Sequence, residues 1–515
     1  MIRKILLLLG LLSLPTMAHA EWHKAVSSHF VVYADEDADA LSDYAEKLER
    51  YDSAARTLRN LPKDATPASR RVTVFLVPTG EFYAIFPRRV GGSHSPRATG
   101  SLIFMPDDGD DSTLFHEYTH HQLALAWAGL SVPGWLNEGM AQAQATAEFR
   151  SDGSVVFGRE LEYAEYMLAD MDSGDMRTML NKSTAGTGET NYYSIGWLLT
   201  HMLTFDNKRQ GQLIDYLVAL NKGQSAPEAA ETAFGDLKKL GSDLQRYRRA
   251  ASLPGVVVPA DQITVGPIEV TKLSAGEAAT IIDAIHSQAG VDEEKAATLY
   301  TKAAADAAPY PNDAGAQRML AEAAFDAKQF DVALEAANRA IAANPKTDGA
   351  YYYKAEAMKE LGEDADAQRP VTDEGLIEQP DSPSLMRLYY KTYTGGNEPA
   401  PLLAKTYLVQ AYKLAPQDPG LRMETASMLL TEDKGAEARA LLRPVAYSVH
   451  RSKAAEHALA AIAAIDEGDL ERAQTELSKQ EDEDETAAQP MGPVVRNRRP
   501  TDAGADLSSA PQIEF

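Results

Sequence analysis

The stretch DSTLFHEYTHHQL, residues 111–123, holds three of the eleven histidines of this 515-residue chain within six positions. Residues four apart on an α-helix point to nearly the same side, so His116 and His120 can offer two ring nitrogens to one cation. Glu117 lies about 100° round the helix from His116, where it can reach a water beside that cation. His-Glu-x-x-His is the spacing of zinc hydrolases. His121 points elsewhere, so we expect it to pack or to support a ligand.

A third ligand is expected on the next predicted helix. In GWLNEGMAQ (134–142), Glu138 is separated from His120 by seventeen residues that include a Gly/Pro turn. Two antiparallel helices joined by a short turn bring such a residue back beside the first pair. Two imidazoles and one carboxylate, with a fourth position open to water, are the donor set of a catalytic zinc site. Asn137 is either a cap or an orienting group. The neighbours expected in the core are Trp135 and Leu136.

The motif HEYTH, followed by WLNEGMA, resembles the gluzincins, thermolysin-like metallopeptidases whose third ligand is a glutamate. The resemblance covers about residues 25–250 and is strong at the two motifs. It implies Glu117 as the general base, which takes a proton from a zinc-activated water and passes it to the departing amine. The zinc ligands that it implies are His116, His120 and Glu138.

Peptide hydrolysis also needs a donor for the carbonyl oxygen that becomes negative. Related peptidases carry a tyrosine ahead of a Gly-Trp-like helical stretch, which matches Tyr193 in TNYYSIGWLLTHML (190–203). Tyr192 and His201 are the alternatives. Each residue also has an interpretation without a catalytic role. Tyr193 would then be an interface aromatic residue with its hydroxyl in water. His201 would be a structural histidine with both ring nitrogens hydrogen-bonded.

The resemblance also bears on the substrate. In this superfamily a substrate chain lies along the sheet edge by strand addition, and here that edge would be RATGSLIFM (97–105). Metallo-aminopeptidases of the superfamily carry a Gly-x-Met-Glu-Asn motif just upstream, whose glutamate holds the free amine. Here GSLIF has no acidic residue, which favours an endopeptidase.

A chain this long is expected to form two or three domains. Alternating and β-branched residues predict strands at 29–35, 70–78 and 101–105. With the helices between them, these predict an α+β zincin-like domain over 21–252, in which a small mixed sheet supports the active-site helices. The run LPGVVVPADQITVGP then predicts a linker over 253–284. The predicted helices are 37–59, 81–86, 112–128, 134–148, 160–170, 190–205, 209–221 and 226–250.

Residues 285–480 are predicted to be an all-α repeat domain. AGAQRMLAEAAFDAKQFDVALEAANRAIAANPKT (314–347) resembles a tetratricopeptide repeat, and weaker frames follow. Its matches to repeat positions 7, 8, 20, 27 and 32 are Leu320, Ala321, Ala333, Ala340 and Pro345. Pro370 is expected to make one unit irregular. The resemblance implies a concave surface for a protein partner or a polypeptide substrate. An unrelated alanine-rich bundle is the alternative.

The ends of the chain carry different signals. Residues 1–20, MIRKILLLLGLLSLPTMAHA, predict a cleaved signal peptide, because a basic start and a short apolar run precede a small-x-small site. The run is too short for a membrane anchor, and no lipobox cysteine follows it, so we expect a periplasmic or secreted protein without stable membrane insertion. The tail 481–515 has few large apolar residues and is predicted to be disordered.

Composition narrows the chemistry. The chain has no cysteine, so a metal must be held by His, Asp or Glu. Its formal charge is −25, or −27 without Arg3 and Lys4, which disfavours nucleic acid as a partner. The acidic run DDGDDS (107–112) is expected to cap the helix that follows, with a calcium site as the alternative.

These observations predict an exported zinc metallopeptidase with one Zn²⁺ per chain. Its repeats are expected to bind a protein partner or the substrate. The main alternative is an envelope scaffold with little turnover, in which the repeats mediate protein–protein interaction. Hydrolysis of a non-peptide amide is a further alternative.

Overall fold

The computed structural model describes most of the chain from Glu21 onward. The described ranges are 21–63, 66–88, 90–159, 176–181, 190–250, 253–394, 399–448 and 452–484, without the side chains of 190–193 and 480–484. The predicted signal peptide, the predicted helix 160–170 and nearly all of the predicted tail therefore lie outside the described residues. What is described is a mixed α+β structure with one six-stranded sheet, a small second sheet and many helices.

The six-stranded sheet has the order β4-β5-β3-β2-β1-β9. Its strands are β1 (Trp22–Val26), β2 (Phe30–Asp35), β3 (Val72–Val77), β4 (Ser93–Ser95), β5 (Ser101–Pro106) and β9 (Glu269–Lys272). β2, β3 and β5 run parallel, and β1, β4 and β9 each run antiparallel to their neighbours. The three strands predicted at 29–35, 70–78 and 101–105 are confirmed as β2, β3 and β5, whereas β1, β4 and β9 were not predicted.

The edge of the sheet beside the helix at residues 111–126 is β4, not the predicted segment 97–105. Ser93 to Ser95 pair with Leu102 to Phe104, so β5 lies inside the sheet and is buried along its whole length. The prediction was wrong because β4 has only three residues, too few to show a period-2 pattern.

The predicted linker 253–284 is instead part of the folded structure. Its β-branched run Val256–Val258 forms β8, which pairs with β7 (Val155–Phe157) in the small sheet, where β6 (Glu148–Phe149) is the third strand. Further on, β9 completes the large sheet against β1, and α11 (Ala275–Gln288) begins within the same segment. Prolines and glycines interrupt the segment, but its backbone hydrogen bonds join it to both sheets.

Helices cover both faces of the large sheet. One face packs against α1 (Ala38–Leu58) and α3 (Asp111–Ala126), with Phe30 and Val32 in the shared core. The other face packs against α2 (Thr79–Ile85) and α11, and Phe104 and Ile285 belong to the buried cluster between them. This division follows from the strand period of two, which sends successive side chains to opposite faces.

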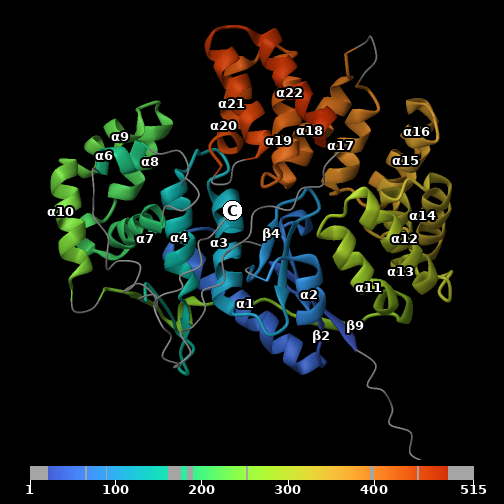
Figure 1. The fold of residues 1–515 in the computed structure, drawn as a ribbon, viewed down its shortest axis with the longest axis horizontal. Helices are drawn as coiled ribbons and strands as arrows, with labels where there is room; N and C mark the ends of the chain where they lie inside the picture. The colour runs from blue at the N-terminus through green and yellow to red at the C-terminus, as the bar shows by residue number, and fades with distance from the viewer. Residues whose placement is uncertain are drawn as a thin grey trace, which may run out of the picture.

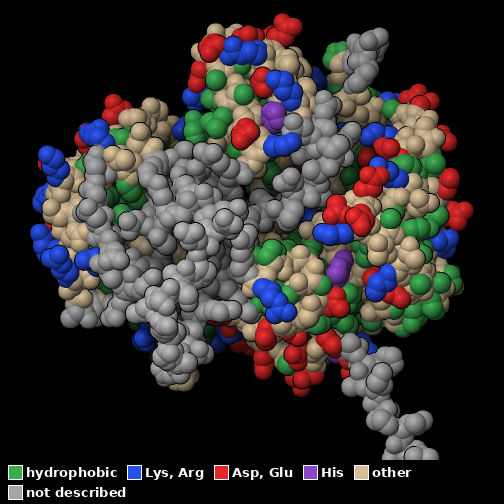
Figure 2. Space-filling model, viewed as in Figure 1, with side chains coloured by type: hydrophobic (Ala, Val, Ile, Leu, Met, Phe, Trp, Pro, Cys, Tyr) green, Lys and Arg blue, Asp and Glu red, His purple; other side chains and the backbone are tan. Residues whose placement is uncertain are grey.

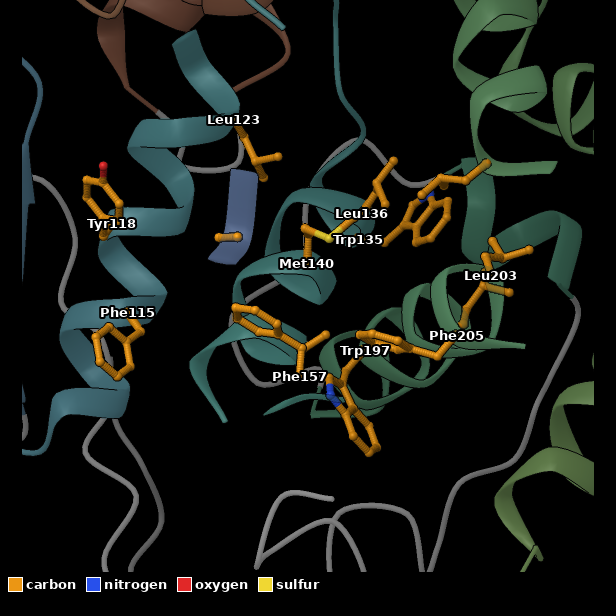
Figure 3. Close-up of a cluster of buried hydrophobic side chains, with 14 of the residues drawn as sticks. Phe115, Tyr118, Leu123, Trp135, Leu136, Met140, Phe157, Trp197, Leu203 and Phe205 are labelled. Carbon is orange, nitrogen blue, oxygen red and sulfur yellow. The ribbon is translucent and has the colours of Figure 1, made fainter. Parts of the chain in front are cut away.

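α3, α4 (Gly134–Ala145) and α7 (Thr190–Phe205) enclose a common apolar core. Figure 3 shows Phe115, Met140 and Trp197 among the side chains that these helices contribute. Trp135 and Leu136 are fully buried, as predicted.

The further helices are α6 (Met176–Asn181), α8 (Gln212–Asn221), α9 (Ala226–Phe234) and α10 (Leu237–Arg248). The predicted helix 226–250 is therefore two helices, which are separated at Gly235, where φ is +79°.

Helices α11 to α22, which we call the helical array, follow one another as packed neighbours. Figure 1 shows the array as an arc that begins beside α2 and returns above α3. The small residues predicted at close helix contacts, such as Ala321, Ala333 and Ala340, are fully buried. α16 continues through Pro370. The later members are α12 (Glu293–Ala307), α13 (Ala314–Asp326), α14 (Phe330–Ala343), α15 (Ala350–Glu360), α16 (Ala365–Glu378), α17 (Pro383–Lys391), α18 (Leu402–Leu414), α19 (Pro419–Leu430), α20 (Gly435–Ala446), α21 (Lys453–Asp466) and α22 (Leu470–Asp484).

The surface carries the negative charge that the composition requires. Figure 2 shows acidic side chains gathered along the lower edge of the molecule, where α1 begins, and the exposed residues there include Asp35, Glu36, Asp37 and Asp39. Among the described residues, no helix is both long and apolar enough to cross a membrane.

Candidate metal centre

Three side chains from α3 and α4 converge on one point. The Nε2 atoms of His116 and His120 are 3.1 Å apart, and they lie 3.5 Å and 3.6 Å from the two carboxylate oxygens of Glu138. One ligand atom from each residue lies within 4.8 Å of the other two. Atoms that are each about 2.1 Å from one zinc ion in a tetrahedron are about 3.4 Å apart, so this spacing fits a zinc site.

The sequence builds this convergence locally. The Asp110 side chain accepts a hydrogen bond from the Ser112 N–H and so caps the start of α3. Helical spacing then places His116 and His120 on one side, and their rings stand at 85° to each other. α4 begins at Gly134, directly after Pro133, and packs on α3, which brings Glu138 to both rings.

A buried tyrosine ties the two helices together from behind. The Tyr51 hydroxyl on α1 lies 2.8 Å from the Thr119 Oγ1, 3.2 Å from the carbonyl oxygen of Phe115 and 3.4 Å from that of Gln144. Phe115 and Thr119 belong to α3, and Gln144 belongs to α4. One side chain therefore contacts both helices that carry the candidate ligands.

The role of Asn137, which the sequence left open, is decided by its contact. The Nδ1 of His120 lies 3.0 Å from the Oδ1 of Asn137, whereas the N-cap of α4 is Pro133. An Nδ1–H that donates to this amide oxygen leaves the lone pair on the Nε2 of His120, which faces His116 and Glu138. Asn137 thus orients a candidate ligand.

His121 is not part of the convergent group. Its Nδ1 lies 2.8 Å from the Ser101 hydroxyl and its Nε2 lies 3.0 Å from the carbonyl oxygen of Arg70. Burial lowers the pKa of His121 to about 4, against the opposing effect of its bond to the Arg70 carbonyl. The ring is therefore neutral at physiological pH and links α3 to β5 and to the segment before β3, which agrees with the packing alternative.

Glu117 lies next to the convergent group and is only 5% exposed. Its Oε1 has no hydrogen-bond partner among the described residues. Burial raises the pKa of Glu117 to about 7; nearby His116 opposes this shift and the Glu138 carboxylate adds to it. A buried carboxyl oxygen without a donor is a feature that calls for a ligand, and a water held by a cation would supply one.

The acidic run 107–112 serves the local fold. Asp107 accepts hydrogen bonds from the backbone N–H and the hydroxyl of Thr79, and Asp111 pairs with Lys47. Among the described residues, neither of the two groups that could hold a metal includes this run. The capping interpretation is supported, and the calcium alternative is not.

The structure contains a second buried group of possible metal ligands, which the sequence analysis did not predict. The Nδ1 of His29 lies 2.8 Å from a Glu49 carboxylate oxygen and 3.3 Å from one of Asp52. Asp52 also accepts hydrogen bonds from Arg56, Tyr118 and Gln122. Protein donors therefore already satisfy these carboxylates, and we interpret the group as a buried charge network that anchors the back of α3.

The structure describes the side chain of only one of the three predicted oxyanion donors, His201. Tyr192 and Tyr193 belong to α7, but their side chains lie outside the described residues, so the role of Tyr193 stays a prediction. His201 is fully buried, with its Nδ1 2.9 Å from the Tyr247 hydroxyl and its Nε2 2.9 Å from the Gly158 carbonyl oxygen. Both ring nitrogens have protein partners, so His201 is a structural histidine and not the oxyanion donor.

No protein-family model matches the chain, and no curated protein is significantly similar to it.

Proposed function

We propose that this chain is an exported zinc metallopeptidase of the gluzincin type. In this proposal His116, His120 and Glu138 hold one Zn²⁺ per chain, and Glu117 is the general base. The observation that carries it is the convergence of two imidazoles and one carboxylate within 4.8 Å, with a second, buried carboxyl group beside them. A scaffold without turnover would have no use for that second carboxyl group.

Zinc bound by this donor set would lower the pKa of a water ligand to about 7 and polarise the substrate carbonyl. Glu117 accepts the proton of the attacking water and later gives it to the departing amine. Burial raises the pKa of Glu117 in the metal-free site, which favours its taking up a proton, and a zinc ion close by would favour the release of that proton. Asn137 keeps the His120 ring in the tautomer that this arrangement needs.

We propose an extended polypeptide as the substrate. It adds as a further strand to β4, which ends the sheet next to α3. β5 offers no acidic side chain that would hold a free amine. This favours cleavage within chains over removal of N-terminal residues.

The remaining parts of the proposal concern the array and the location. We propose that α13 to α22 form tetratricopeptide-type repeats, on the support of the 34-residue pattern and of buried alanines at the close contacts, such as Ala404 and Ala461. Export to the periplasm or beyond rests on the pattern of residues 1–20.

The decisive experiment compares the mature wild-type protein with Glu117→Gln. We expect both proteins to carry one zinc ion, and the variant to cleave casein or a peptide library about 10²- to 10⁴-fold more slowly. His116→Ala is expected to lose both zinc and cleavage. Glu46→Gln, an exposed carboxylate on α1, is the matched control and is expected to cleave like the wild type. Wild-type protein that holds zinc and cleaves no peptide would instead favour the scaffold.

A further inference from the structure

The helical array contacts the part of the chain before α11 that carries the six-stranded sheet, which we call the sheet domain, again at the turn between α18 and α19. Gln417 in this turn is only 6% exposed, and its Nε2 donates hydrogen bonds to two backbone carbonyl oxygens, at 2.8 Å to Ser69 and at 3.0 Å to Arg97. These partners precede Gln417 by more than 300 residues. A single buried carboxamide therefore joins two separate segments of the sheet domain to the array.

The sheet domain also donates hydrogen bonds to the array at this contact. Leu414 ends α18, and its carbonyl oxygen accepts hydrogen bonds from the Ser69 hydroxyl at 3.0 Å and from the Arg70 guanidinium at 3.2 Å. The Arg70 guanidinium also donates to the carbonyl oxygen of Lys413. The last carbonyls of a helix have no partner within it and carry partial negative charge, so a cation and a hydroxyl are suitable donors there.

One of the two segments carries the edge strand. Arg97 and Ala98 lie in the connection from β4 to β5, and Ala98 is buried in the apolar core of the array. The Arg97 guanidinium donates to the carbonyl oxygen of Gln288, at the end of α11. The array thus holds this connection at two places, once through Gln417 and once through Gln288.

The other segment supports α3. Ser69 and Arg70 form η1 (Ala68–Arg70), directly before β3. The carbonyl oxygen of Arg70 accepts the hydrogen bond from the Nε2 of His121, which directly follows the proposed ligand His120. Hydrogen bonds therefore run from the array through Arg70 to the helix that carries the metal-binding histidines.

We propose that Gln417 is a positioning residue of the peptidase site, and that the α18–α19 turn of the array holds the β4 edge in place for substrate binding. The inference follows from the hydrogen bonds of Gln417 to the carbonyl oxygens of Ser69 and Arg97. The kinetic test of the inference rests on the proposed peptidase function. The array then supports the edge strand to which the substrate binds. The surface of the array at the α18–α19 turn is covered by the sheet domain of the same chain.

The test compares Gln417→Leu with Gln410→Leu, an exposed glutamine on α18, in the full mature protein. Leucine has a similar size but cannot donate to the two carbonyls. We expect the KM for an extended peptide to rise about three- to tenfold in Gln417→Leu, with kcat within about twofold and zinc content unchanged. A merely structural role would reduce the folded fraction and so lower the apparent kcat at constant KM. Either that pattern or unchanged kinetics would overturn the proposal.

Hydrogen–deuterium exchange gives a readout that does not depend on activity. We expect the amides of residues 90–106 to exchange faster in Gln417→Leu than in Gln410→Leu. If the wild type cleaves no peptide but this change occurs, the peptidase function fails and the positioning contact stands. If Gln417→Leu does not fold, Arg70→Met removes the bonds to Lys413 and Leu414 from the other side and is expected to raise KM and exchange in the same way. Unchanged exchange in the folded variant would overturn the proposal.

Discussion

The ring of His120 is held through its Nδ1, which lies 3.0 Å from the side-chain oxygen of Asn137, the residue directly before Glu138. One turn of α4 therefore supplies both a proposed ligand and the group that orients another. We predict that Asn137→Ala lowers zinc affinity about 10- to 100-fold, because the His120 ring loses the acceptor that fixes its tautomer and orientation. Competition with a zinc-binding chelator measures this change.

The matched control for this prediction is Asn207→Ala, because Asn207 is an exposed amide in η2 (Asn207–Arg209), outside the candidate site. Its zinc affinity is expected to equal that of the wild type. An Asn137→Ala protein that binds zinc as tightly as the wild type would show that the contact with His120 does not orient a ligand.

The buried network around Asp52 leads to a prediction about both metal content and stability. Asp52 pairs with His29 and Arg56, so Asp52→Asn removes the charge that both of them face. We expect the free energy of unfolding to fall by about 3–5 kcal/mol, as for other buried pairs that lose one partner. The zinc content is expected to stay at one ion per chain. Urea unfolding and elemental analysis measure the two quantities.

Asp43→Asn, an exposed carboxylate on the same helix, is the control for this prediction and is expected to change neither quantity. A fall from two metal ions to one in Asp52→Asn would mean that His29, Glu49 and Asp52 form a second metal site rather than a charge network.

The candidate ligands could be predicted because helical spacing is a local property. His116 and His120 are four residues apart, so any helix brings them together, and a short turn is enough to return Glu138 to them. The strands β2, β3 and β5 could be predicted for the same reason, since a period-2 pattern in β2 and short runs of β-branched or apolar residues in β3 and β5 are visible within six residues.

What could not be predicted depends on contacts between distant segments. β9 pairs with β1, so that Lys272 lies opposite His23, and no local pattern indicates such a partner. Asp52 is charged and would be placed at the surface from its residue type, yet it is buried because four side chains bind it. Gln417 is an ordinary polar residue until the fold places Ser69 and Arg97 beside it.

The contact of α4 with α7 leaves no room for a side chain at Gly139. A Cβ there would lie 2.3 Å from the Thr200 hydroxyl oxygen and 2.6 Å from the carbonyl oxygen of Gly196. We predict that Gly139→Ala lowers the free energy of unfolding by about 1–3 kcal/mol, and that it weakens zinc binding because α4 must move with Glu138. Gly80→Ala is the control, since nothing lies within 4 Å of a Cβ at Gly80. Equal urea unfolding curves for the two variants would contradict the prediction.

Asp326 on α13 makes the stability of the array depend on pH. Burial, with the like charge of Glu322, raises the pKa of Asp326 from its ordinary 3.8 to about 6, although the Ser287 hydroxyl donates to it. The proton bound in the folded state adds stability that is complete below about pH 3.8 and is lost as the pH rises through about 6. We therefore predict that Asp326→Asn is about 1–2 kcal/mol more stable than the wild type at about pH 7.5, and that this difference shrinks towards about pH 4. Urea unfolding at several pH values measures it, and a difference that stays constant with pH would contradict the assignment.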